Sequence, residues 1–393
     1  MATHRKRKDF IKGIKDVHGE WVMDEEAVSS IFVDFYSRLF TTSCPTDLER
    51  VLEGVQPVVS ESMNEVLTRP YIREEVDVAI KQMAPLKAPG LDSMPPLFFQ
   101  TFWSDIGLDV SESMLSCLNS RTILNSINHI FLTLIPKVKN PETIAQFRPI
   151  SLSNVIYNIL SKVIVNRLKP FLNSIMSEVQ SAFVADRVIT DNILIAFESL
   201  HHMKIQCSGK TGFMALKLDM SKAYDRVEWV FLEKILLKMG FQDTWVAMIM
   251  QCITTVSYSI MVNGEPKVLF ILLGGYGKVN LCLLFLFLFC AEGLNALLTQ
   301  VAKTGDIRGY SFCRARPKIT HLFFADDCLL FCRATLLNVK KSKVFLHGMR
   351  LLQGNSLILT KLRLSLVGIH LRLPRANCKF CWGCQLFGIM RNT

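Results

Sequence analysis

The sequence predicts an α+β fold in which helices dominate the first 205 residues and strands ending in acidic side chains follow. Apolar residues recur at helical spacing over residues 25–40 and 74–83. Short apolar runs typical of strands occupy residues 131–136 and 213–219. Two later segments have the apolar arms and turn residues of β-hairpins. Helical and strand patterns of this kind, grouped in different parts of the chain, are typical of the α+β class.

The two early helices are bounded by helix-breaking residues. Pro45 lies shortly after the first helix, and the loop Pro85-Leu-Lys-Ala-Pro-Gly-Leu-Asp92 follows the second. Lys87 on this loop is either a phosphate contact or an ordinary solvated lysine.

A strand, a loop and a long helix are expected next. Pro136 closes the strand, and the segment from Arg148 leads through Ser153 into a helix that extends towards Leu168. A further helix is predicted to end at about Met203.

The last predicted elements carry the carboxylates. The strand over residues 213–219 ends at Asp219, and a helix is expected over residues 222–239. Asn263-Gly264 is a strong turn signal and predicts a hairpin. A second hairpin, over residues 319–332, has Asp326-Asp327 at its tip, where two adjacent charges repel each other unless a cation lies between them.

Charge and cysteine content restrict the function and the compartment. The 393 residues carry a net charge of +11, which favours a polyanionic partner such as nucleic acid or an anionic membrane surface, although an unrelated basic enzyme is an alternative. Twelve scattered cysteines and no signal peptide indicate an intracellular protein, nuclear or cytoplasmic, that is not secreted. The most apolar run, residues 281–290, is shorter than the roughly 20 residues of a membrane span, so no membrane association is expected.

Asp219, Asp326 and Asp327 are candidate ligands for metal ions. Phosphoryl transfer to a hydroxyl uses two divalent cations about 3.5 to 4 Å apart, bound by carboxylates, and oxygen ligands suit Mg²⁺. Asp219 precedes Asp326 by 107 residues, so only tertiary folding can bring them together. Taken singly, Asp219 is also compatible with a helix N-cap, and the aspartate pair with a turn.

The residues around these carboxylates resemble the palm motifs of reverse transcriptases, and further segments extend the resemblance to plant non-LTR (LINE-type) retrotransposons. The motifs occur in the order of that family: Lys87-Ala-Pro-Gly-Leu-Asp, Leu134-Ile-Pro-Lys, Phe147-Arg-Pro-Ile-Ser-Leu-Ser-Asn, Gln180-Ser-Ala-Phe-Val, Leu216-Lys-Leu-Asp-Met-Ser-Lys-Ala-Tyr-Asp-Arg-Val, Cys290-Ala-Glu-Gly-Leu and Phe324-Ala-Asp-Asp.

This resemblance implies a right-hand polymerase with fingers and an antiparallel palm sheet that carries the Asp-Asp hairpin. Residues 1–75 would be a helical connector, residues 76–205 the fingers and residues 206–335 the palm. Residues 336–393 would be a degenerate remnant of palm and thumb, the thumb being missing or scrambled. No endonuclease is recognisable, so we expect the chain to be part of a longer element.

The resemblance also implies the chemistry. Asp219, Asp326 and Asp327 would bind two Mg²⁺ ions for RNA-directed DNA synthesis. Tyr224 would be the steric gate beneath the incoming sugar, or else a core aromatic. Arg148 and Lys137 would bind the nucleotide triphosphate, or else form surface salt bridges. The expected partners are an RNA template, a DNA primer or target and dNTPs, with the oligomeric state left open.

Three features depart from the family. The Gly-Leu-Arg-Gln-Gly-(Asp/Glu)-Pro-Leu-Ser-Pro signature is absent, and residues 274–284 have the sequence expected of a frameshifted version of it. On that hypothesis residues 281–289 are an out-of-frame product. The helix that normally precedes the next palm motif, near residue 338, is also missing. Cys378, Cys381 and Cys384 lack a convincing fourth zinc ligand and are better interpreted as stray cysteines.

Two other functions stay open. One is a catalytically inactive remnant that binds RNA through its basic surface. The other is a relative such as a group II intron maturase, which would require a thumb and a maturase segment after the palm.

Overall fold

A computed structural model describes residues 10–42, 48–205, 212–219, 227–271, 281–305, 307–312, 318–325, 327–333 and 364–369. The chain forms two compact units, each assembled from three separate stretches. The first unit comprises Met1–Cys44, Val59–Pro170 and Tyr224–Leu286, and the second comprises Pro45–Val58, Phe171–Ala223 and Phe287–Thr393. The predicted division into connector, fingers, palm and remnant instead follows chain order, and its boundaries remain a prediction.

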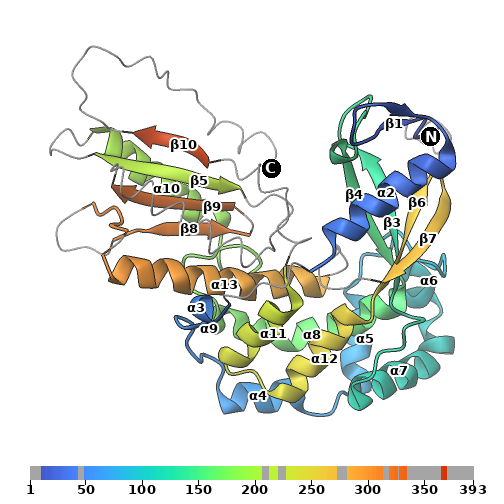
Figure 1. Ribbon diagram of the computed structural model, residues 1–393. Helices are drawn as coiled ribbons and strands as arrows, with labels where there is room; N and C mark the ends of the chain where they lie inside the picture. Colours follow the sequence, from blue (N-terminus) through green and yellow to red (C-terminus); the bar gives the residue numbers. More distant parts are fainter. Residues whose placement is uncertain are drawn as a thin grey trace. The chain divides into compact units, whose positions relative to one another are not determined.

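The first unit contains a four-stranded mixed sheet in the order β4-β3-β6-β7 (Figure 1). Its strands are β3 (His129–Pro136), β4 (Phe147–Ser153), β6 (Ser257–Val262) and β7 (Glu265–Ile271). β3 runs antiparallel to β4 and parallel to β6. The loop predicted between Pro136 and the long helix is therefore wrong over Phe147–Ser153, because pairing with β3 makes this segment a strand. The β6–β7 hairpin, which lies in the range predicted for the palm, is therefore part of the same sheet as β3 and β4.

The turn of the β6–β7 hairpin confirms the Asn-Gly prediction. Asn263 and Gly264 have φ angles of 52° and 95°. Both values lie in the left-handed region that a two-residue hairpin turn of the type I′ class requires, and asparagine and glycine adopt it most easily.

Helices make up the rest of the first unit, and the predicted helical segments at 25–40, 74–83 and up to residue 168 are confirmed. α8 is the most buried of these helices, because apolar side chains surround it on most sides. The main helices are α2 (Glu25–Leu39), α4 (Glu61–Thr68), α5 (Arg73–Lys81), α6 (Pro96–Thr101), α7 (Trp103–Ser120), α8 (Val155–Leu168), α11 (Trp229–Lys238) and α12 (Asp243–Thr254).

The predicted start of the helix after Asp219 is wrong in the described part of the chain. α11 begins at Trp229, and Glu228 before it is extended, with φ −76° and ψ 127°. Glu228 has the extended backbone usual for the residue that precedes a helix, and its carboxylate accepts a hydrogen bond from the Thr42 hydroxyl at 2.5 Å. Residues 222–226 lie outside the described residues.

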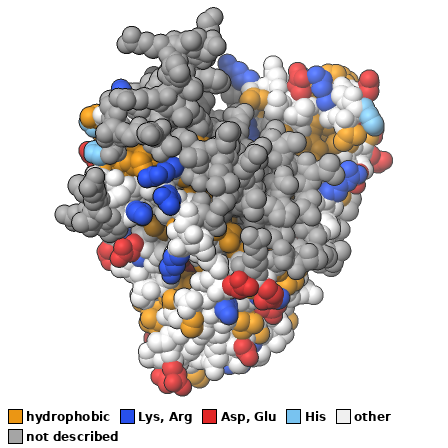
Figure 2. Space-filling model, turned by 60° about the vertical axis from the view of Figure 1, so that its left-hand side comes forward, with side chains coloured by type: hydrophobic (Ala, Val, Ile, Leu, Met, Phe, Trp, Pro, Cys, Tyr) orange, Lys and Arg blue, Asp and Glu red, His pale blue; other side chains and the backbone are white. Residues whose placement is uncertain are grey.

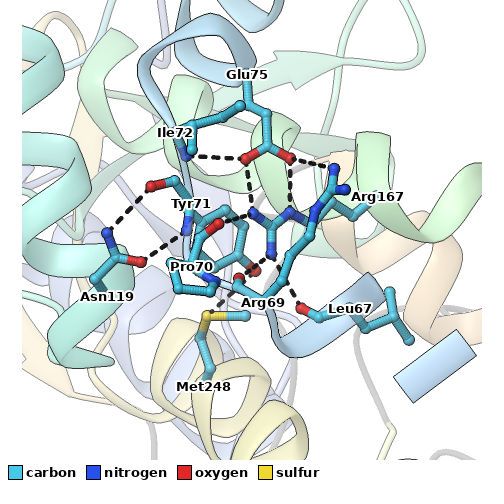
Figure 3. Close-up of polar contacts among 9 residues, drawn as sticks. All are labelled: Leu67, Arg69, Pro70, Tyr71, Ile72, Glu75, Asn119, Arg167 and Met248. Atoms are coloured by element: carbon cyan, nitrogen blue, oxygen red, sulfur yellow. Dashed lines mark hydrogen bonds and ion pairs between the residues drawn. The ribbon is translucent and has the colours of Figure 1, made fainter. Parts of the chain in front are cut away.

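A buried arginine connects α8 to the chain between α4 and α5 (Figure 3). The Arg167 Nε and Nη2 donate to the two carboxylate oxygens of Glu75, each at 2.7 Å. The same guanidinium donates to the backbone carbonyls of Leu67, Arg69 and Pro70 and lies 3.5 Å from the centre of the Tyr71 ring. Burial raises the pKa of Glu75, but the hydrogen bonds and charge of Arg167 outweigh it and lower this pKa.

The second unit contains a four-stranded sheet in the order β10-β5-β9-β8, antiparallel throughout. Its strands are β5 (Phe213–Asp219), β8 (His321–Phe324), β9 (Asp327–Arg333) and β10 (Leu364–Ile369). The strand predicted over residues 213–219 and the hairpin predicted over residues 319–332 are confirmed in the described residues. β10 was not predicted, because no motif is recognisable in that part of the sequence.

The described α-helices of this unit are the short α3 (Leu48–Leu52) and α9 (Leu172–Ile175), the longer α10 (Ile189–Ile205) and most of α13 (Leu281–Lys303). α10 contacts β8 and lies behind the sheet in Figure 1, and Met203 joins Ala215 and Phe331 in a buried cluster. α13 begins with the apolar run at residues 281–290. That run is therefore the first part of a helix, whatever the reading frame of its codons.

α13 is the one helix in the described part of the chain that is long and apolar enough to cross a membrane. In the most apolar stretch of Phe285–Lys303, 67% of the residues are buried inside the protein. A buried core helix passes the same test, so hydropathy alone is weak support for a membrane span.

Candidate active site

The fold brings two of the three predicted carboxylate residues onto neighbouring strands. Asp219 ends β5 and is the register partner of Asp327, which begins β9. Residues paired in this way in an antiparallel ladder have Cα atoms about 4.5 to 5.5 Å apart. The pairing of β5 with β9 thus brings together two aspartates that are more than 100 residues apart in the sequence.

The Asp327 carboxylate lies beside a lysine ammonium. Lys217 Nζ is 3.0 Å from Asp327 Oδ1, and the two side chains are 31% and 48% exposed. Lys217 lies two residues before Asp219 on the same strand, β5. The repulsion expected around Asp327 is therefore offset in part by a cation from the chain itself. This role of Lys217 was not predicted from the sequence, because it depends on the pairing of β5 with β9.

The turn between β8 and β9 is tight. Phe324 pairs with Asp327, so Ala325 and Asp326 alone connect the strands. Ala325 has φ 53°, a left-handed conformation that costs energy in a residue with a Cβ and persists only where its surroundings fix it. Asp326 itself lies outside the described residues.

The predicted nucleotide-binding residues belong to the first unit. Arg148 is exposed on β4, opposite Ile135 of β3. Lys137 directly follows β3, and its ammonium donates to the Ala145 carbonyl at 2.9 Å. The structure thus places Arg148 and Lys137 at the same end of one strand pair. Tyr224 lies outside the described residues.

The donor set suits a hard divalent cation. Carboxylate oxygens are the ligands that Mg²⁺ prefers, and Asp327 is exposed enough for an ion to reach it. Among the described residues no group of three His, Cys, Asp or Glu side chains is close enough to bind a metal ion. The Asp219 side chain, Asp326 and Cys378, Cys381 and Cys384 are outside that description.

A buried polar network lies behind the hairpin and was also missed. Glu292 of α13 accepts from the Ser177 backbone N–H at 2.9 Å and from its hydroxyl at 2.8 Å, and from the Asn295 amide at 2.9 Å. Asn295 Oδ1 is also 2.9 Å from Nε2 of His321 on β8. Burial raises the pKa of Glu292 and lowers that of His321 to about 4. His321 is therefore neutral at physiological pH and supplies hydrogen bonds rather than charge.

Comparison with known proteins agrees with these observations. The family model for reverse transcriptase (RNA-dependent DNA polymerase) matches residues 135–341, more than half of the chain and a range that includes both aspartate strands.

Two relatives are similar over shorter stretches. A 149 kDa uncharacterized protein of transposon TX1 from Xenopus laevis is 31% identical over 247 residues, which is 60% of this chain and 18% of that protein. An uncharacterized mitochondrial protein from Arabidopsis thaliana is 32% identical over 95 residues, 24% of this chain and 77% of that protein. The chain thus spans less than a fifth of the transposon protein's length. Because the family model covers the strands that carry Asp219 and Asp327, the chain belongs to the reverse transcriptase (RNA-dependent DNA polymerase) family.

Proposed function

We propose that this chain is the polymerase core of a LINE-type, non-LTR retrotransposon and copies RNA into DNA by two-metal nucleotidyl transfer. The observation that carries the proposal is the pairing of Asp219 with Asp327 inside the range that matches the family model. The similarity to a transposon protein supports the retrotransposon context. The motif order supports the finer assignment to a LINE-type element like those of plants.

In this proposal Asp219, Asp326 and Asp327 hold the two Mg²⁺ ions. When bound, the ions supply Lewis-acid stabilisation of the attacking 3′ hydroxyl and of the leaving pyrophosphate. The chain's own part is to place the carboxylates. β5 and β9 fix the backbone of Asp219 and Asp327 by their ladder, and Lys217 neutralises the Asp327 carboxylate until an ion displaces it.

The nucleotide is the proposed ligand of Arg148 and Lys137, with Tyr224 beneath the sugar. The exposed Arg148 presents a planar guanidinium that can donate two hydrogen bonds to phosphate oxygens. The proposed partners are therefore an RNA template, a DNA primer or target and dNTPs, in the nucleus or cytoplasm of the host cell.

Primer extension on an RNA template with Mg²⁺ tests the proposal. We expect DNA synthesis by the parent protein and its loss in Asp219→Asn and Asp326→Asn. Asp109→Asn is the matched control, since Asp109 is exposed on α7 in the first unit. Equal activity in all four proteins, or none in the parent, would contradict the proposal.

A second candidate function is an inactive remnant that binds RNA. The net charge of +11 and the missing family signature at residues 274–284 favour it. Figure 2 shows Lys and Arg side chains gathered in small clusters on one face, with Asp and Glu side chains in others. RNA binding that weakens with salt, without primer extension, would identify this remnant. Sequencing the locus across codons 270–345 tests whether its reading frame is disrupted.

A further inference from the structure

The short strand β8 lies at the edge of its sheet. Residues 179–181, called the covering segment below, lie along that edge. Phe323 N donates to the Val179 carbonyl at 2.8 Å, and Ser181 N donates to the Phe323 carbonyl at 3.4 Å. Gln180 thereby forms a parallel bridge with Phe323. The backbone groups that an edge strand otherwise leaves open are satisfied here within two residues of the Asp-Asp turn.

The Gln180 side chain reaches the turn itself. Its Oε1 accepts hydrogen bonds from Ala182 N at 3.0 Å and from Ala325 N at 3.1 Å. Gln180 is only 1% exposed. Its Nε2 is buried without a hydrogen-bond partner among the described residues, so the two Oε1 contacts alone fix where this amide lies. Ala325 is the left-handed residue immediately before Asp326, so one buried oxygen anchors the conformation of the turn.

Asn192, near the start of α10, contacts both the covering segment and β8. Its Nδ2 lies 2.8 Å from the Phe323 carbonyl, 3.0 Å from the Ser181 hydroxyl and 3.2 Å from the Val179 carbonyl. An amide nitrogen has two hydrogens, so these three acceptors share them. Asn192 therefore couples α10 to β8 and to the covering segment at one point.

Arg187 also holds the covering segment and the residues that precede it. Its guanidinium donates to the backbone carbonyls of Asn173, Met176, Ser177 and Gln180 and to the Asn173 side chain. The segment that carries Gln180 is therefore held by hydrogen bonds from both Asn192 and Arg187, which a support for a precisely placed turn requires.

We propose that Gln180 and Asn192 are positioning residues for the metal-binding turn and fix the position of Asp327 relative to Asp219. This inference rests on the proposed function of the carboxylates. Functional carboxylates have to stand within about 0.5 Å of their productive positions, and hairpin tips are among the parts of a fold that open most easily. The contacts of Gln180 and Asn192 converge on Phe323 and Ala325, the residues that lead into the aspartates.

Metal binding by variants tests this role without polymerase activity. Fe²⁺ with ascorbate and peroxide cleaves backbone beside a site that binds divalent cations, and Mg²⁺ competes with the cleavage. In the parent we expect cuts near residues 219 and 327 that Mg²⁺ suppresses. Gln180→Met keeps the length of the side chain but removes the acceptor, and Asn192→Leu removes the donor. For both we expect Mg²⁺ affinity to fall roughly 10- to 100-fold, as for other groups that orient metal ligands.

Asn119→Leu is the matched control for lost hydrogen bonds. The Asn119 amide makes a similar backbone clamp in the first unit, accepting from Tyr71 N at 2.8 Å and donating to the Tyr71 carbonyl at 3.2 Å (Figure 3). We expect it to lower thermal stability and to leave the Mg²⁺ competition curve unchanged. Asn192 is partly exposed, so its variant keeps the test decisive if Gln180→Met does not fold.

The outcomes separate this inference from the proposed function. Parent-like Mg²⁺ competition in folded Gln180→Met or Asn192→Leu would overturn the positioning role and leave the metal site standing. Absence of cleavage near residues 219 and 327 in the parent would overturn the metal site, and the positioning role with it.

Discussion

Each unit contains an ion pair, one beside the chain between α4 and α5 and the other at the start of β9. The two pairs differ in geometry and in exposure to solvent. Arg167 and Glu75 meet through two hydrogen bonds of 2.7 Å, with side chains 3% and 18% exposed. Lys217 and Asp327 meet through one contact of 3.0 Å, with side chains 31% and 48% exposed. In the buried pair, the remaining donors of Arg167 are taken up by backbone carbonyls. In the exposed pair, the Asp327 carboxylate remains accessible to solvent.

The difference indicates what each pair does. A buried pair whose remaining donors are satisfied by carbonyls is costly to disrupt and fixes the chain between α4 and α5. An exposed pair contributes little stability, and a competing cation can displace the lysine. Loss of the first should thus damage folding, and loss of the second should change metal binding.

The largest expected effect comes from removing the accessible carboxylate. Asp327→Asn should lower the rate of primer extension by about 10⁴-fold, a loss typical of removing an essential catalytic group. Its thermal unfolding should stay close to that of the parent, because the side chain is half exposed. Steady-state primer extension and calorimetry measure the two quantities. A variant that unfolds without losing specific activity would reverse the proposed contrast.

Breaking the buried pair should have the opposite profile. Arg167→Met leaves the Glu75 carboxylate and three carbonyls without their donor, and we expect a loss of about 3 to 5 kcal/mol in the free energy of unfolding. Urea titration followed by circular dichroism measures it. Lys139→Met, at an exposed position between β3 and β4, is the control and should change stability by less than about 0.5 kcal/mol.

The buried pair should also impose a pH dependence. The pKa of Glu75 is lower in the folded protein than its ordinary value of 4.5, so the unfolded chain binds more protons. The resulting stabilisation is present above the unfolded pKa and is lost as the pH falls through the folded pKa. Glu75→Gln should flatten this part of the stability curve below about pH 4.5 relative to the parent. An unchanged slope would show that other carboxylates dominate.

The smallest effect is expected at the exposed lysine. Lys217→Met removes the cation that competes with Mg²⁺ at Asp327, so the Mg²⁺ concentration for half-maximal Fe²⁺ competition should fall a few-fold. Stability should change by less than about 1 kcal/mol. Lys303→Met, at the end of α13 in the same unit, has the same net charge as Lys217→Met and serves as the control. Weaker Mg²⁺ binding in Lys217→Met would show that the lysine supports the ion instead of competing with it.

Local patterns were sufficient for most elements and insufficient where distant segments meet. The Asn263-Gly264 turn and the strands that end at Pro136 and Asp219 follow from neighbouring residues, and the structure agrees with them. The start of α11 was missed, and the extended Glu228 before it is in contact with Thr42, 186 residues away in the sequence. β10 was missed as well, because a strand without a recognisable motif is defined only by its pairing with β5.

The candidate site divides in the same way. The sequence by itself determined the family, the oxygen-rich ligand set and the hairpin that carries Asp327, since residue type and local spacing encode these. Only the tertiary structure decided that Asp219 faces Asp327, that Lys217 lies beside that carboxylate, and that Gln180 and Asn192 brace the turn. Strand register and side-chain packing join residues more than 100 positions apart, and no local pattern specifies such pairs.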